Sequence, residues 1–197
     1  MIESLKNHFL MAMPTLSEGF FAGSLTYICE HNEAGAMGIV VNQPLDVDLG
    51  EILEHLDIPH RPETTEQVIL AGGPVRVDHG FVLHNGDSEW DSTLQVASGI
   101  SLTTSRDVLA AIGRDSGPPQ HLIALGYAGW AAGQLEDELA RNSWLTVPAS
   151  PDILFAVPCE ERLQAAGHCL GIDIRLLSSA AGHALSLIHI SEPTRPY

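Results

Sequence analysis

Four short segments of this 197-residue chain combine glycine with side chains that can bind a ligand or carry a proton. They span residues 30–42, 72–80, 126–130 and 134–136, and each begins or ends an apolar run. Glycine at such a position allows unusual backbone angles and lets the chain approach a ligand closely. Histidine beside a carboxylate can act as a general base, and an aromatic ring with a polar tip suits a ligand site. The candidate binding residues are His31, Asn32, Asn42, Gly72, Gly73, Asp78, His84, Tyr127, Trp130, Gln134 and Glu136.

We expect these residues to edge one pocket that takes a small polar ligand or part of a protein partner. Motifs for catalysis are missing from the sequence: there is no GxSxG, HExxH, HxH or CxxC element. Gly72-Gly73-Pro74 has neither the third glycine nor the Lys-Ser/Thr of a phosphate-binding loop. No catalytic residue, metal or cofactor is therefore predicted. The alternative is an enzyme with an unfamiliar site made of His31, His84 and Glu136, which requires these side chains to converge.

Several candidates have a structural interpretation as well. Gly72-Gly73 is either a tight turn or a pocket floor. Asn32 suits a hairpin turn as well as a binding loop, and Asn42 can fix the exit of its strand by side-chain hydrogen bonds. Trp130 either fills the core or faces a ligand, and its spacing of four from Gln134 predicts a shared helix face.

Histidine and a carboxylate also lie next to a predicted strand over residues 81–83. Neighbouring residues on a strand point to opposite faces, so we expect Asp78 and His79 not to pair. His84, at the other end of this strand, is either structural or a binding residue.

The net charge of −16 disfavours direct binding to nucleic acid, because such binding depends on lysine and arginine neutralising phosphates. The nine basic residues are scattered and form no cluster in the sequence. No apolar run is long enough to cross a membrane, and the N-terminus does not resemble a signal peptide, so a cytoplasmic location is expected. Cys29, Cys159 and Cys169 form no CxxC pair and are expected to be buried small hydrophobic residues rather than a disulfide framework or a zinc site.

Apolar periodicity predicts interspersed strands and helices. The expected strands span 8–13, 25–29, 36–41, 68–70, 81–83, 122–125 and 144–147, with two more in 93–101 around Ser98-Gly99. The expected helices span 49–56, 105–112, 131–139 and 158–170, with a helical turn at 17–22. Because these elements form no regular βαβ repeat, a mixed α+β fold is favoured over a doubly wound sheet.

The chain resembles the YqgE/AlgH family of small bacterial proteins over nearly its whole length to Ala184. The segments that carry the resemblance are His8–Pro14, Thr26–Asn32, Gly35–Asn42, Gly72–Val75, Gly80–His84, Ser105–Leu109, Leu125–Trp130 and Ala181–Ala184. The resemblance implies an α+β fold with a bifurcated mixed sheet that contains a small closed barrel, surrounded by helices. It implies little about a reaction, although one branch of the family is linked by name to regulation of alginate production. Gln43 and His79 stand where basic residues are common in the family, which puts an anion contact there in question.

We therefore expect residues 1–184 to form a single domain and residues 185–197 to be a non-native or disordered tail; the alternative is a genuine tail that binds a partner. The predicted function is that of a non-catalytic binding or regulatory module. Transcriptional regulation is implied only by the resemblance, without strong direct DNA binding.

Overall fold

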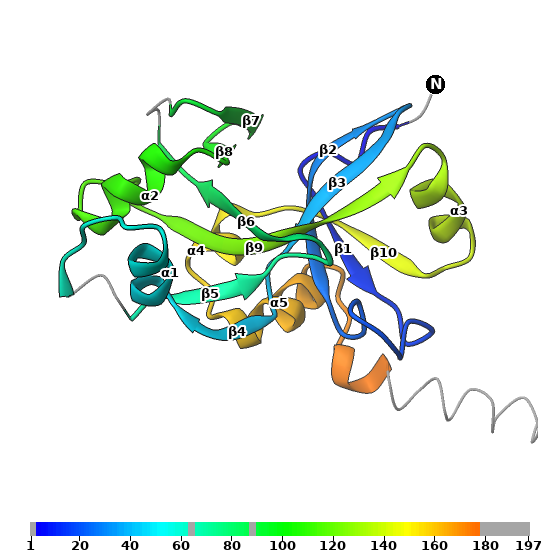
Figure 1. Ribbon diagram of the computed structural model, residues 1–197. Coiled ribbons are helices and arrows are strands. Elements are labelled where there is room, and N and C mark those ends of the chain that lie inside the picture. The colour runs from blue at the N-terminus through cyan, green and yellow to red at the C-terminus, as the bar shows by residue number, and fades with distance from the viewer. Residues whose placement is uncertain (1–2, 63–65, 87–89, 178–197) are drawn as a thin grey trace, which may run out of the picture.

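The computed structural model describes residues 3–62, 66–86 and 90–177 (Figure 1). The strands are β1 (His8–Ala12), β2 (Leu25–Asn32), β3 (Gly35–Val40), β4 (Pro44–Asp48), β5 (Val68–Ala71), β6 (Val75–His84), β7 (Thr93–Ala97), β8 (Ile100–Thr103), β9 (His121–Ala131) and β10 (Trp144–Pro148). The helices are α1 (Leu49–His55), α2 (Arg106–Gly113), α3 (Gln134–Ala140), α4 (Pro151–Phe155), the 3-10 turn η2 (Cys159–Glu161) and α5 (Arg162–Cys169).

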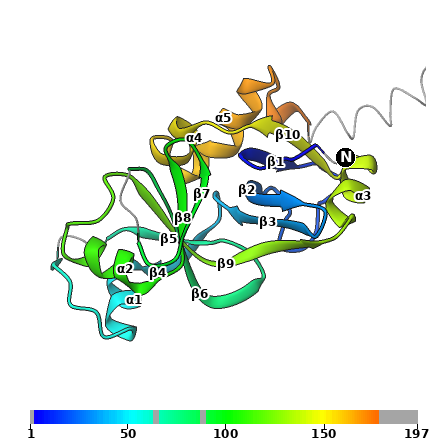
Figure 2. The same cartoon turned by 90° about the horizontal axis from the view of Figure 1, so that it is seen from above.

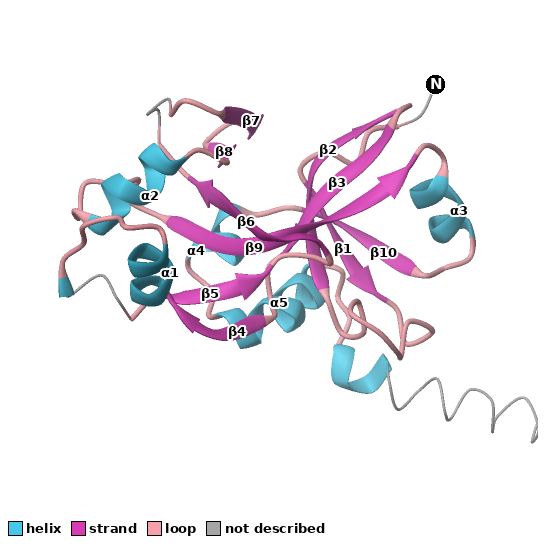
Figure 3. Cartoon of the chain, viewed as in Figure 1, coloured by secondary structure: helices cyan, strands magenta, loops and turns pink. Residues whose placement is uncertain are grey.

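The long strand β9 joins two halves of one sheet, whose strand order is β10-β1-β2-β3-β9-β6-β8-β7. Residues Ile123–Leu125 of β9 pair in parallel with β5, while Ala128–Ala131 pair with β3. On their other edge, residues 121–125 of β9 pair with β6, so the sheet forks in the middle of β9. Figure 3 shows the strands of both halves converging at this point.

Glycine makes the fork possible because two chains come very close there. A Cβ on Gly73 would lie 1.9 Å from the backbone carbon of Tyr127, and one on Gly72 would lie 2.4 Å from the carbonyl oxygen of Gly126. Gly126 also has a φ of +78°, which other residues adopt only at a cost. The glycines of two distant segments therefore pack against each other.

The first half is a curled sheet of β10, β1, β2, β3 and the end of β9, and α3 lies against both β9 and β10 (Figure 2). Its interior is apolar and contains Leu10, Ile28, Trp130, Leu135 and Trp144. Leu135 is the buried residue of α3. Burial of this residue attaches the helix to the sheet.

The second half carries α1 and α2 on one face, where Leu49, Leu53, Val108 and Ile112 pack with Ile123 of β9. Helices α4 and α5 lie on the other side of the molecule, where α5 contacts β1 and β10 and α4 contacts α5 and β9 (Figure 2). They complete the largest apolar cluster, which links both halves of the sheet. A capping box between Asp48 and Glu51 starts α1, as expected from the acidic residues before it.

The predicted α+β fold, with a forked mixed sheet surrounded by helices, is confirmed. The expected small barrel is a half-barrel among the described strands, because β10 lies at the end of the strand order and pairs with β1. Gly99, with a φ of +76°, turns the chain between β7 and β8 as expected. One boundary prediction was wrong: β9 continues to Ala131 and α3 begins only at Gln134, so Trp130 lies on a strand. The expected helical turn at 17–22 is an irregular series of turns.

The predicted tail 185–197 lies outside the described residues, and the single-domain prediction remains untested. Within the described residues, no helix has the length and apolar character needed to traverse a bilayer.

Candidate functional site

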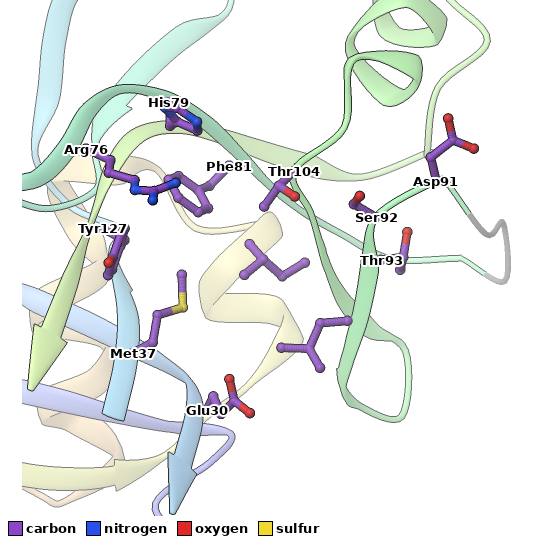
Figure 4. Close-up of a pocket in the computed structure, with 12 residues that line it drawn as sticks. Glu30, Met37, Arg76, His79, Phe81, Asp91, Ser92, Thr93, Thr104 and Tyr127 are labelled. Carbon is purple, nitrogen blue, oxygen red and sulfur yellow. The ribbon is translucent and has the colours of Figure 1, made fainter. Parts of the chain in front are cut away.

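An open cleft of about 720 Å³ lies between the β2–β3 hairpin and the strands β6, β7 and β8 (Figure 4). Three parts of the chain line it. The hairpin supplies Glu30 and Met37, β6 and β9 supply Arg76, His79, Phe81 and Tyr127, and the region of β7 and β8 supplies Asp91, Ser92, Thr93, Leu94, Leu102 and Thr104.

The upper wall of the cleft in Figure 4 is formed by an irregular start of β6. Val75 pairs with Tyr127 and Gly80 pairs with Leu125, so the four residues Arg76–His79 stand opposite the single residue Gly126. The chain therefore bulges away from β9, and all four bulged residues are exposed. Figure 4 shows the side chains of Arg76 and His79 on this wall, with Arg76 extended in the direction of Phe81.

Arg76 combines a strained backbone with an unpaired charge. Its φ of +47° lies in the left-handed region, which costs a non-glycine residue about 1–2 kcal/mol. Among the described residues, no carboxylate forms an ion pair with its guanidinium. Backbone strain of this kind concentrates at functional sites, so the conformation of Arg76 supports a functional role for the cleft.

The cleft has an apolar floor and a polar border. The rings of Phe81 and Tyr127 pack edge to face with centroids 5.5 Å apart, and Met37 lies beside them (Figure 4). Hydroxyl groups of Ser92, Thr93 and Thr104 border the opposite side, and Asp91 and Glu30 add carboxylates. The site can thus meet a ligand with an apolar part, an anionic group and hydrogen-bonding groups.

The prediction that Asp78 and His79 do not approach each other was wrong. Nδ1 of His79 lies 3.6 Å from Oδ1 of Asp78, and both side chains are largely exposed. Strict alternation of side chains applies to a regular strand, and the bulge that begins at Arg76 breaks it.

His84 is buried behind the cleft and does not line it. Its Nε2 lies 2.7 Å from the hydroxyl of Thr103, which in turn lies 2.9 Å from the hydroxyl of Thr93, and its Nδ1 lies 3.2 Å from the carbonyl oxygen of Asn85. Burial lowers the pKa of His84, which favours the neutral imidazole. This histidine therefore supports the wall from which Thr93 reaches the cleft.

His31, which is buried, forms a contact with the half-buried Glu136 at the start of α3. Nε2 of His31 lies 2.6 Å from Oε1 of Glu136, and Nδ1 accepts a hydrogen bond of 2.9 Å from the backbone N–H of Leu5. Because Nδ1 is an acceptor, Nε2 carries the proton and donates it to the carboxylate. The hydrogen bond from His31 lowers the pKa of Glu136, and the imidazole side chain is only 1% exposed.

Trp130 and Gln134 share a different partner, Glu138. The indole N–H groups of Trp130 and Trp144 both donate to Oε2 of Glu138 at 2.8 Å, and the amide of Gln134 donates to Oε1 at 3.1 Å. Both indoles are almost completely buried. This arrangement connects α3 to β9 and β10, and it gives Trp130 a structural role.

The two asparagines satisfy backbone groups. Oδ1 of Asn32 accepts from the N–H of Ala34 within the hairpin turn. Asn42 accepts from the N–H of Leu25 and donates to the carbonyl of Gly23, which fixes the chain where it leaves β3. Asn32 also borders a smaller hollow of about 220 Å³ beside Trp130, and this hollow shares Glu30 and Met37 with the cleft.

The candidates taken from the sequence therefore divide among several places. Tyr127 lines the cleft, Asp78 lies on its bulge, and Asn32 and Trp130 border the adjoining hollow. Gly72 and Gly73 are buried against Gly126 and Tyr127 of β9. The remaining ones have the contacts described above and do not line the cleft: His31, Asn42, His84, Gln134 and Glu136.

Sequence reasoning missed Arg76, Phe81 and the hydroxyl residues at the start of β7 and directly after β8. Arg76 carried a signal, because it is a basic residue directly after Gly-Gly-Pro-Val in a strongly acidic chain. Ser92, Thr93 and Thr104 carried none, since nothing local distinguishes them from other strand-end residues. Within the described part of the chain, no three histidine, cysteine or acidic residues gather as a metal site.

The fold defines a mixed α+β protein in which a curled half-barrel and an open sheet share one strand. The AlgH-like family profile matches residues 9–175, and the chain belongs to this family. A UPF0301 protein of Saccharophagus degradans is 52% identical over 181 residues, which cover 92% of this chain and 89% of that protein. A UPF0301 protein of Thioalkalivibrio sulfidiphilus is 54% identical over 178 residues, covering 90% of this chain and 96% of that protein.

The solution structure of the AlgH protein from Pseudomonas aeruginosa is similar to this fold, with a TM-score of 0.77. It is 49% identical in sequence, and the match covers 90% of this chain and 97% of that chain. The family resemblance expected from the sequence is thereby confirmed.

Proposed function

We propose that the protein is a non-catalytic binding module whose cleft takes a small polar ligand or a peptide, with an anionic group of that ligand on Arg76. The observation that carries this proposal is the position of Arg76 on the wall of a cleft of about 720 Å³. Its backbone is strained, and its guanidinium forms no ion pair among the described residues. A cleft of this volume is in the range of small-molecule sites, about 300–1,000 Å³.

The local charges support an anionic group at this end of the cleft. Arg76 and His79 line the cleft from the bulge, whereas the carboxylates of Glu30 and Asp91 line it from the hairpin and from beside β7 (Figure 4). Asp78 also lies on the bulge, 3.6 Å from the imidazole of His79, but it does not line the cleft. Arginine binds carboxylates and phosphates through two parallel hydrogen bonds, which makes it a good anion ligand. The chain carries a net charge of −16, so the guanidinium of Arg76 is the group in the cleft that attracts an anion.

The alternative of an enzyme with His31, His84 and Glu136 receives less support. His31 and Glu136 are in contact, but His84 is bonded to Thr103 and Asn85 behind the cleft. Both ring nitrogens of each histidine already have hydrogen-bond partners. A general base needs a nitrogen within reach of the substrate, and neither imidazole offers one.

A regulatory role, if the link of one family branch to alginate production extends to this chain, would run through this binding site. The net charge of −16 opposes direct contact with DNA, so regulation would use a ligand or a protein partner. We infer a cytosolic location, which agrees with the three free cysteines. The expected burial holds for Cys29, whereas Cys159 is half-buried and Cys169 is exposed.

The test is calorimetric titration of the protein with a panel of carboxylates, phosphorylated metabolites and short peptides. For any ligand that binds, we expect Arg76→Gln to weaken binding at least tenfold. Arg114→Gln, an exposed arginine at the end of α2, is the matched control and should leave the affinity unchanged. The proposed function would be refuted if the wild type, Arg76→Gln and Arg114→Gln bound with equal affinity, or if nothing in the panel bound.

A further inference from the structure

The cleft lies next to a smaller hollow at the tip of the β2–β3 hairpin. This hollow is lined by Asn32, Ala34 and Trp130, among others, and it shares Glu30 and Met37 with the cleft. The two hollows therefore adjoin each other at these shared side chains. We call them together the groove, which reaches from the hairpin turn to the bulge of β6.

The bulge also has backbone that pairs with no strand of the described residues. The sheet register gives Arg76–His79 no partner on β8, which pairs with Val82–His84, and none on β9, where one residue spans the whole bulge. Val77, in the middle of the bulge, is 62% exposed, and the neighbouring Arg76 and His79 line the cleft. Exposed backbone without a neighbouring strand can form hydrogen bonds with another extended chain.

Charged side chains of opposite sign lie at two ends of the cleft. Arg76 lies on the bulge and Glu30 lies where the cleft meets the hairpin hollow, with Met37 and Tyr127 between them in Figure 4. An extended chain that lies along the groove would thus place an acidic side chain at Arg76, apolar side chains over Met37, and a basic side chain at Glu30.

We propose that the ligand of this groove is an extended peptide segment of a partner protein, with an acidic and a basic residue separated by apolar ones. This inference rests on the proposed binding function and specifies its ligand. The peptide contributes backbone hydrogen bonds to the bulge of β6, and its two charges set the direction in which it lies.

The test uses fluorescein-labelled, acetylated nonapeptides in which one Asp and one Lys stand at every spacing in a Val-Ala-Ser background, with binding followed by fluorescence anisotropy. We expect one spacing to bind at least tenfold more tightly than acetylated aspartate amide measured by competition. Arg76→Gln and Glu30→Gln should each weaken this peptide at least fivefold, whereas Glu33→Gln, an exposed carboxylate of the same hairpin that does not line the groove, should have no effect.

Two further measurements test the direction of the peptide and its backbone hydrogen bonds. Glu30→Lys should bind best to the peptide in which Lys is replaced by Glu, which restores the charge pair. N-methylation of single backbone amides of the best peptide should weaken binding at least tenfold at one or more positions. Tolerance of N-methylation at every position would overturn the strand-like mode.

The remaining outcomes distinguish the two proposals. If acetylated aspartate amide or inorganic phosphate binds in a manner sensitive to Arg76→Gln and no peptide binds more tightly, the peptide inference is overturned and the binding function stands. If neither peptides nor small anions bind, both proposals fall.

Discussion

Replacement of Glu138 by alanine should destabilise the protein strongly, although the side chain is polar. Its Oε2 accepts hydrogen bonds from the indoles of Trp130 and Trp144, both at 2.8 Å, and these residues are only 6% and 4% exposed. Without the carboxylate, two buried N–H donors lose their partner. Each unsatisfied donor costs about 1–3 kcal/mol, so we expect a loss of about 2–6 kcal/mol in the free energy of unfolding.

Glu138→Gln should cost less, about 1–2 kcal/mol, because an amide oxygen still accepts from the indoles while the charge is lost. Asp137→Ala removes an exposed neighbouring carboxylate and is the control, with a change within about 0.5 kcal/mol. The assay is urea unfolding followed by circular dichroism at 222 nm, because the fluorescence of the tryptophans themselves changes with the mutation. A double-mutant cycle with Trp144→Phe should show that this second change costs less in the Glu138→Ala background than in the wild type.

The reasoning would be refuted if Glu138→Ala and Glu138→Gln were equally stable, or if the cycle gave no coupling. Either result would mean that the indoles find other partners or water. The packing of α3 would then rest on Leu135 and the aromatic contacts alone.

The remaining predictions concern the fork of the sheet, the bulge of β6 and two histidines whose pKa is lowered, His84 and His121. Gly73→Ala should cost more than about 3 kcal/mol or prevent folding, because its Cβ would meet the backbone of β9 at 1.9 Å, whereas Gly99→Ala, with open space around it, should cost only about 1–2 kcal/mol of backbone strain; urea unfolding compares the two. Arg76→Gly should raise the free energy of unfolding by up to about 1 kcal/mol by relieving the left-handed φ, while it abolishes ligand binding in the titrations above; a loss of stability would contradict the strain argument. Burial lowers the pKa of His84 and His121 in the folded state, so the unfolded chain takes up protons first as the pH falls below about 6.5. Stability should therefore be fully present above that pH and fall below it by up to about 1.4 kcal/mol per pH unit for each histidine, and a flat profile between pH 7.5 and 5.5 would exclude this linkage.

Much of the secondary structure followed from the order of residues. Apolar runs with β-branched residues predicted the strands around Tyr27, Ile39 and Ile123, and acidic residues before Leu49 predicted the start of α1. These signals are local, since each depends on a few neighbouring residues and on the period of a strand or helix. The end of β9 was misplaced because Ala131 and Leu135 are compatible with a helix, and only pairing with β3 keeps the chain extended to Ala131.

The site illustrates the limit of local signals. The glycine-containing segments around Met37, Gly73 and Tyr127 were recognised in the sequence, yet their glycines serve the approach of one strand to another, and the ligand cleft lies beside them. Arg76 lines the cleft because it lies on a bulge, where four residues of β6 face one residue of β9. This register depends on the pairing of two distant strands.

The sequence by itself determined the family, the class of fold and the acidic character of the surface, because these depend on motifs, periodicity and composition. Tertiary structure decided which polar side chains became structural partners, as with His31 and Glu136, which are 105 positions apart and yet form one hydrogen bond. It also decided that a cleft forms between the hairpin and β6–β8, because a cleft depends on distances between segments that no local pattern encodes.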